Sequence, residues 1–140
     1  MKKTVAVDLD GVLATYDGWK GIDNIGEPIV GAVQFTKDLS AFARVVIFTT
    51  RCKTYPPTAP GPKGMPEPCR DDVNALVQRV VEWLDRHGFA WHEVYCGQGK
   101  PFAAAYIDDR AVVCRPQAVQ DKAFEFHCAK EFVRQLCERA

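Results

Sequence analysis

The chain has 140 residues, with 18 Lys and Arg side chains against 18 Asp and Glu, so its formal net charge is zero. This length leaves no room for a second domain, and we expect residues 1–140 to fold as one globular domain. The neutral charge excludes a broad nucleic-acid-binding coat, and no apolar run is long enough to cross a membrane. A hydrophobic content of 47% is enough to build a core.

The first element in chain order is a short apolar run at residues 4–7. It ends abruptly in Asp8-Leu9-Asp10-Gly11, which predicts a buried strand followed by a turn. Residues 12–27 have no sustained period and predict a loop or small hairpin. The apolar spacing of residues 28–43, which begin with proline, predicts a helix.

A second apolar run, 45–48, ends in Thr49-Thr50-Arg51 and predicts another strand with polar residues at its carboxyl end. Residues 53–68 are crowded with proline and glycine, which predicts an extended insertion without regular structure. A helix follows over residues 71–88, where Asp71 and Asp72 can cap its start and Gly88 its end.

The last part of the chain predicts shorter elements. Residues 91–96 favour a third strand, and 103–107 a fourth that stops at Asp108-Asp109-Arg110. Residues 111–114 favour a short fifth strand. Residues 117–139 predict a terminal helix that packs through its apolar side chains.

Apolar strands that alternate with helices predict a doubly wound α/β fold, with a parallel sheet covered on both faces. Ligands of such sheets bind beyond the carboxyl ends of the strands, near the point where strand order reverses. The polar residues after three of the predicted strands would therefore gather in one site.

Four carboxylates in one site would repel one another unless a cation lay among them, and all-oxygen ligands favour Mg²⁺. With Asp8 and Asp108 on that ion, Asp8 becomes a usable nucleophile toward phosphorus. Asp10, two residues further on, can protonate the leaving group and then deprotonate the attacking water. Thr49, Lys100 and nearby backbone amides are the candidate donors to the phosphoryl oxygens.

Taken together and in order, four segments resemble the four motifs of the haloacid dehalogenase superfamily of phosphohydrolases. They are Asp8-Leu9-Asp10-Gly11-Val12, Val46-Ile47-Phe48-Thr49, Lys100, and Tyr106-Ile107-Asp108-Asp109-Arg110. The resemblance covers about residues 4–114. It implies a three-layer Rossmann-like fold, Mg²⁺ held by Asp8, Asp10, Asp108 and Asp109, and hydrolysis of phosphomonoesters through an aspartyl phosphate on Asp8. The backbone carbonyl of Asp10 would be its metal ligand.

Within the superfamily the chain is similar to small members without a cap domain, because neither interval between motifs holds a folded cap. Two positions depart from the pattern: Val12 replaces a frequent threonine, and Lys100 stands unusually close to the acidic pair. An open site suggests that residues 53–68 act as a substitute lid or contact another protomer of a homo-oligomer.

Several alternatives stay open at this point. Thr50, Arg51 and Arg110 are candidate substrate-binding residues, although the two arginines could instead pair with local aspartates. Basic side chains near the site, Lys20 among them, also suit a nucleotide or polynucleotide 3′-phosphate end. A third possibility is a noncatalytic module that keeps the fold and the metal.

Other known phosphate sites fit the sequence less well. A phosphoacceptor receiver domain carries similar residues in a different order, and the glycines before Lys100 lack the spacing of a P-loop. The six cysteines form no Cys-x-x-Cys pair. We expect reduced thiols in a cytoplasmic protein.

Overall fold

The computed structural model describes residues 1–52, 73–97 and 99–139. These residues form two compact units, Met1–Asp109 and Arg110–Ala140, and each unit is described here by itself. The proline-rich insertion over 53–68 and the caps at Asp71 and Asp72 lie outside the described residues.

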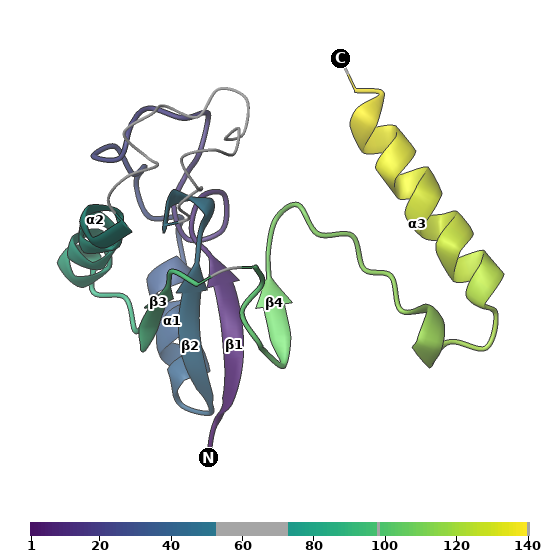
Figure 1. The fold of residues 1–140 in the computed structure, drawn as a ribbon, viewed down its shortest axis with the longest axis horizontal. Helices are drawn as coiled ribbons and strands as arrows, with labels where there is room; N and C mark the ends of the chain where they lie inside the picture. The colour runs from purple at the N-terminus through teal and green to yellow at the C-terminus, as the bar shows by residue number, and fades with distance from the viewer. Residues whose placement is uncertain (53–72, 98, 140) are drawn as a thin grey trace. The chain divides into compact units, whose positions relative to one another are not determined.

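The first unit is built on a four-stranded parallel sheet with the order β3-β2-β1-β4 (Figure 1). Its strands are β1 (Lys3–Asp8), β2 (Ala43–Phe48), β3 (Glu93–Tyr95) and β4 (Ala105–Ile107). The chain moves outward from β1 to β3 and then crosses back to the other side of β1. Strand order therefore reverses between β1 and β4, where an α/β sheet offers a ligand site.

Two helices, α1 (Ala32–Ser40) and α2 (Val73–His87), contribute to one hydrophobic cluster with the sheet. Val7, Ile47 and Val94 occupy the same register across three strands, so they point to one face, and all three belong to this cluster. From α2, Leu76, Val80, Trp83 and Leu84 are buried against them. The alternation of the strands therefore directs these three side chains toward the helices.

Helix α1 starts later than its apolar spacing predicts. Pro28 pairs with Ala14 in an isolated bridge, and the Ile29 N–H donates to the Leu13 carbonyl at 2.9 Å. Gly31 then takes a left-handed conformation with φ of 90° before the first helical turn. The backbone of residues 28–31 is therefore used to hold the preceding loop rather than to extend the helix.

The second unit contains a short 3₁₀ turn, η3 (Pro116–Ala118), and helix α3 (Lys122–Cys137). The Asp121 carboxylate caps α3 by accepting the Phe124 N–H at 2.9 Å. The prediction of a fifth strand over 111–114 is wrong, because these residues pair with no strand in the part of the chain that the structure describes.

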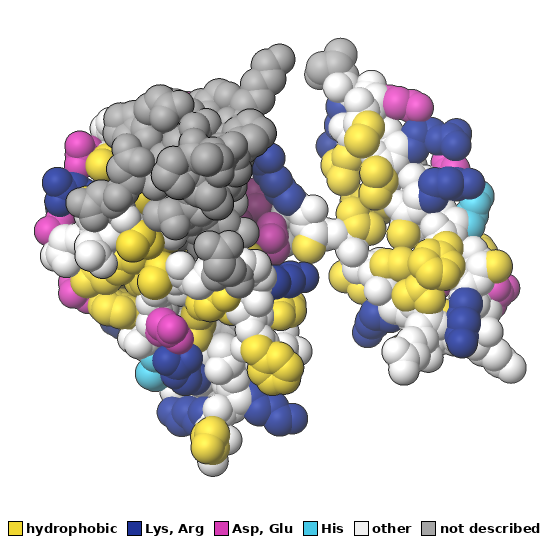
Figure 2. All heavy atoms as spheres, in the orientation of Figure 1, with side chains coloured by type: hydrophobic (Ala, Val, Ile, Leu, Met, Phe, Trp, Pro, Cys, Tyr) yellow, Lys and Arg dark blue, Asp and Glu magenta, His cyan; other side chains and the backbone are white. Residues whose placement is uncertain are grey.

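The terminal helix forms as predicted, but none of its apolar side chains is buried. Figure 2 shows apolar groups on the surface of this unit. The large exposed ones on α3 are Phe124, Phe126, Phe132, Val133 and Leu136.

The predicted α/β class with a parallel sheet is confirmed. Among the helices of residues 1–52, 73–97 and 99–139, none has the length and apolarity needed to cross a membrane. Five cysteines fall in these ranges, and each has a free thiol.

Candidate active site

Three carboxylates meet at the carboxyl ends of the two strands that flank the switch in strand order. Asp8 is the last residue of β1, and Asp108 and Asp109 directly follow β4. One oxygen from each of these carboxylates can be chosen so that all three lie within 4.8 Å of one another. Three of the four carboxylates that the strand pattern predicted in one site are thus grouped, and a divalent cation could be held by these oxygens.

Burial and like charges both disfavour the ionised form of Asp8. Together they raise its pKa from the usual 3.8 to about 7, with burial as the largest cause and the charges of Asp108, Asp109 and Asp10 adding to it. A hydrogen bond that the Leu9 N–H donates to Oδ1 at 2.8 Å acts in the opposite direction. A cation among the carboxylates would offset both the burial and the like charges, and so would lower the pKa of Asp8 and favour its carboxylate form.

The glycine of the first motif lets the turn pass close to this cluster. Gly11 has a φ of +86°, a conformation that favours glycine. A Cβ atom at this position would collide with the carboxylate of Asp109. Gly11 is therefore needed both for the shape of the turn and for the space occupied by Asp109.

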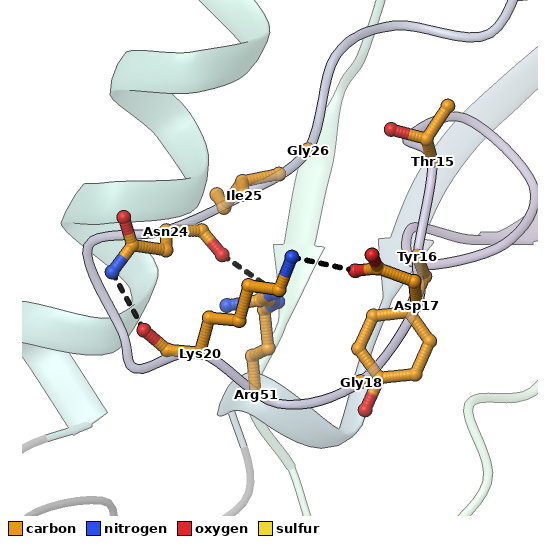
Figure 3. Close-up of a pocket in the computed structure, with 9 residues that line it drawn as sticks. All are labelled: Thr15, Tyr16, Asp17, Gly18, Lys20, Asn24, Ile25, Gly26 and Arg51. Carbon is orange, nitrogen blue, oxygen red and sulfur yellow. Dashed lines mark hydrogen bonds and ion pairs between the residues drawn. The ribbon is translucent and has the colours of Figure 1, made fainter.

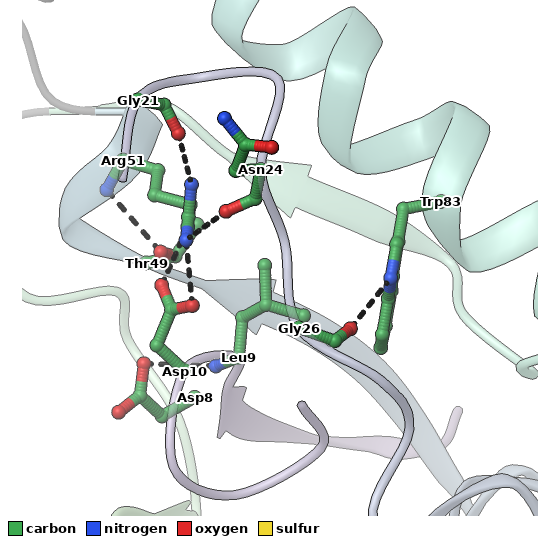
Figure 4. Close-up of polar contacts among 9 residues, drawn as sticks. All are labelled: Asp8, Leu9, Asp10, Gly21, Asn24, Gly26, Thr49, Arg51 and Trp83. Carbon is green, nitrogen blue, oxygen red and sulfur yellow. Dashed lines mark hydrogen bonds and ion pairs between the residues drawn. The ribbon is translucent and has the colours of Figure 1, made fainter. Parts of the chain in front are cut away.

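The Asp10 carboxylate is paired with an arginine rather than grouped with the other carboxylates. Arg51 binds its carboxylate with two nitrogens, Nε to Oδ2 at 2.6 Å and Nη2 to Oδ1 at 2.9 Å (Figure 4). The Arg51 side chain is 4% exposed and that of Asp10 14%. Of the two roles considered for Arg51, the structure shows the pairing with a local aspartate.

The two threonines after β2 differ in their environment. Thr49 is buried, and its hydroxyl accepts the Arg51 N–H at 3.2 Å. Thr50 is exposed and begins a short 3₁₀ helix, η1 (Thr50–Cys52), that carries the Arg51 side chain. Thr49 thus helps to fix the backbone of the residue that binds Asp10.

Lys100 and Arg110, two further predicted site residues, are not among the carboxylates grouped at Asp8. The Lys100 ammonium lies over the ring of Tyr106, 4.1 Å from its centroid, and the lysine is exposed. Arg110 begins the second unit. The catalytic role of Lys100 and the substrate-binding roles of Thr50 and Arg110 stay predictions.

The loop of residues 15–27, called the 15–27 loop below, lines a cavity of about 420 Å³ together with Arg51 (Figure 3). Lys20 pairs with Asp17 at 2.8 Å, and the Asn24 amide donates to the Lys20 carbonyl at 2.6 Å. Carbonyls of this loop also accept hydrogen bonds from Arg51. Sequence reasoning missed these acceptors, because a backbone carbonyl leaves no signal in residue types.

No protein-family model matches the chain, and comparisons with curated proteins and with solved structures return no significant match. The class of protein therefore rests on its own residues and on their arrangement.

Proposed function

We propose that the protein is a Mg²⁺-dependent phosphomonoester hydrolase of the haloacid dehalogenase superfamily, of the small type without a cap. The observation that carries the proposal is the meeting of Asp8, Asp108 and Asp109 at the switch in strand order, within 4.8 Å, with Asp10 two residues after Asp8. Polar groups of the kinds that phosphoryl transfer needs thus lie at one edge of a parallel sheet.

In the first step an oxygen of the Asp8 carboxylate attacks phosphorus, and the bond between phosphorus and the ester oxygen breaks. Asp10 gives a proton to the departing oxygen, so an alcohol leaves and an aspartyl phosphate remains on Asp8.

In the second step Asp10, now a carboxylate, takes a proton from water. The water oxygen attacks phosphorus, the bond to Asp8 breaks and inorganic phosphate is released. One residue acts first as an acid and then as a base, and both carboxylates end in their starting forms.

Asp8, Asp108, Asp109 and the Asp10 carbonyl are the proposed ligands of Mg²⁺. When bound there, the ion offsets the negative charge shared by the carboxylates and the phosphoryl group. The raised pKa of Asp8 supports such a cation, because near neutral pH the residue would otherwise be divided between its acid and its nucleophilic form.

The test is release of phosphate from 4-nitrophenyl phosphate with and without Mg²⁺. We expect turnover that requires Mg²⁺ and that falls more than about 1,000-fold in Asp8→Asn. Asp38→Asn is a matched control, because Asp38 is exposed on α1, where it accepts a hydrogen bond from Gln34 at 2.8 Å. Turnover by Asp8→Asn at the parent rate would refute the mechanism.

A panel of phosphate esters would identify the substrate class. Selective hydrolysis of a 3′-phosphorylated oligonucleotide, with affinity that falls steeply with salt, would indicate a polynucleotide 3′-phosphatase. Mg²⁺ binding without turnover of any ester would instead indicate a noncatalytic module.

A further inference from the structure

The guanidinium of Arg51 joins the candidate acid/base residue to the loop beside it. Besides its two bonds to Asp10, it donates from Nη1 to the Gly21 carbonyl at 3.3 Å and from Nη2 to the Asn24 carbonyl at 3.1 Å (Figure 4). Its carbon Cζ lies over the ring of Trp19, 4.8 Å from the centroid. One buried side chain thus contacts two parts of the chain that are distant from it in sequence.

These contacts leave Arg51 little capacity to bind a substrate phosphate. A guanidinium has five N–H donors, and the four bonds to Asp10, Gly21 and Asn24 use most of them. The side chain is also only 4% exposed. Its geometry suits a role that is exerted through Asp10 rather than through contact with the substrate.

The planar fork of the guanidinium fixes both oxygens of the Asp10 carboxylate at once. Such a bidentate pair sets the rotation of the carboxylate as well as its position. Proton transfer needs the carboxyl oxygen within hydrogen-bond reach of the leaving oxygen, so a small rotation is enough to impair it.

We propose that Arg51 is a positioning residue that orients the Asp10 carboxylate for proton transfer and ties this orientation to the 15–27 loop. The inference rests on the phosphatase function proposed above. Loop and acid/base residue share one guanidinium, so a displacement of the loop carbonyls would also disturb Asp10.

The test compares two esters that differ in their need for a proton. Nitrophenolate is a weak base and departs without being protonated. The alkoxide of a simple alkyl phosphate is a strong base and needs a proton as it departs. In Arg51→Lys the charge stays but the fork is lost. With Mg²⁺ present, we expect kcat/KM for the alkyl phosphate to fall about 100-fold, and that for 4-nitrophenyl phosphate by less than about threefold.

The ratio kcat/KM is the correct readout because it covers only the steps up to departure of the leaving group. Loss of folded enzyme would lower both values equally. For variant protein shown to be folded, an equal loss for both esters, or no loss for either, would overturn the inference.

Arg79→Met is the matched control. Arg79 on α2 holds the same loop through Asp23, with Nε 2.5 Å from Oδ1, but its partner is not the acid/base residue. We expect its kcat/KM ratio for the two esters to equal that of the parent. Arg79 and Asp23 form an exposed pair, so we expect the loop carbonyls at Gly21 and Asn24 to stay in place in this variant. A selective loss as large as that in Arg51→Lys would show that the loop position alone accounts for the effect and would overturn the inference.

If Arg51→Lys does not fold, Trp19→Leu provides the test, since it removes the ring that lies against the guanidinium but keeps both residues of the Asp10 pair. We expect a smaller loss that is again selective for the alkyl phosphate, and an equal loss for both esters would overturn the inference.

A further variant tests the dependence on Asp10. If Arg51 acts through Asp10, adding Arg51→Lys to Asp10→Asn should lower kcat/KM for the alkyl phosphate no further. An additional 100-fold loss would overturn the inference.

The two proposals fail in different ways. If the parent protein hydrolyses neither ester, the proposed function itself is refuted. If the parent is active and depends on Asp8, but Arg51→Lys is unselective, only the role of Arg51 is refuted.

Discussion

Asp8, at the end of β1, and Asp10, in the turn that follows, are two residues apart, yet their surroundings are opposite in charge. Asp8 faces Asp108 and Asp109, and burial together with these negative charges raises its pKa to about 7. Asp10 is held by the protein's own cation, Arg51, in a pair with distances of 2.6 and 2.9 Å.

This difference indicates that an external cation would stabilise the Asp8 side of the turn, whereas the Asp10 side already has an arginine. On the Asp10 side the guanidinium lies against the acid/base carboxyl group, where it would balance the negative charge that appears once Asp10 has given up its proton. On the other side the carboxylates gather at the end of β1 and β4, a grouping that a divalent ion would stabilise. The two aspartates therefore suit two different tasks, one at the metal and one in proton transfer.

The largest expected effect separates these two tasks. With 4-nitrophenyl phosphate, Asp10→Asn should still form the aspartyl phosphate but hydrolyse it slowly, because no base activates water. We expect a burst of nitrophenolate, equal to the enzyme present, and a steady rate about 100- to 10,000-fold below the parent. Asp8→Asn should give no burst. Rapid-quench measurement with acid-trapped phosphoprotein distinguishes the two.

If Asp8→Asn and Asp10→Asn behave alike, the two aspartates do not have the separate tasks proposed here. A burst in Asp8→Asn would mean that another residue accepts the phosphoryl group. Absence of a burst in Asp10→Asn, with the steady rate reduced as expected, would mean that Asp10 is needed already for the first step with this ester.

Gly11→Ala should disturb the Asp109 side of the turn. The new Cβ atom would meet the Asp109 carboxylate, and the φ of +86° adds backbone strain. We expect the Mg²⁺ concentration for half-maximal activity to rise about 10- to 100-fold. A Mg²⁺ titration of the activity measures this change.

Gly31→Ala is the matched control, because Gly31 has a φ of +90° with nothing within 4 Å of the added atom. It carries the same kind of strain without the contact to Asp109. An equal change of Mg²⁺ dependence in both variants would show that strain, and not the displaced carboxylate, is responsible.

Much of the cluster could be predicted from the sequence, because the carboxyl ends of parallel strands meet at one edge of the sheet. Asp8, Thr49 and Asp108 each follow an apolar run, and the structure places Asp8 at the end of β1 and the other two directly after β2 and β4. Hydrophobic runs are local signals, so they locate strand ends well.

Features that depend on distant partners could not be predicted. Arg51 had two possible partners until the fold placed it 2.6 Å from Asp10, 41 positions earlier in the chain. The β-branched residues Val112 and Val113 favour a strand, but a strand also needs a neighbour with free backbone groups. Pro28 likewise suits a helix start, whereas its pairing with Ala14 keeps it in the loop.

The raised pKa of Asp8 predicts how stability changes with pH when no divalent ion is present. Between about pH 4 and 7 the folded protein keeps a proton on Asp8 that the unfolded chain has already lost, so stability falls as pH rises through this window. Asp8→Asn removes this loss. Because the carboxyl group is partly solvated, we expect the variant to be about 1–2 kcal/mol more stable at pH 8.

Urea unfolding in a chelating buffer at pH 4 and pH 8 measures this difference. Added Mg²⁺ should then stabilise the parent more than the variant at pH 8, because only the folded cluster binds the ion. Equal stabilisation of both proteins would contradict the metal site at Asp8.

The smallest expected effect concerns the second arginine that holds the 15–27 loop. Arg79 and Asp23 form an ion pair with side chains 43% and 69% exposed, so solvent screens their attraction. We expect Arg79→Met to change the midpoint of thermal unfolding by less than about 2 °C. Arg51→Lys should lower it more, because this change disrupts a pair in which Arg51 is only 4% exposed. If the two substitutions lower the midpoint equally, burial of the Asp10 pair does not distinguish the two arginines. The contrast between the two sides of the turn would then be confined to catalysis.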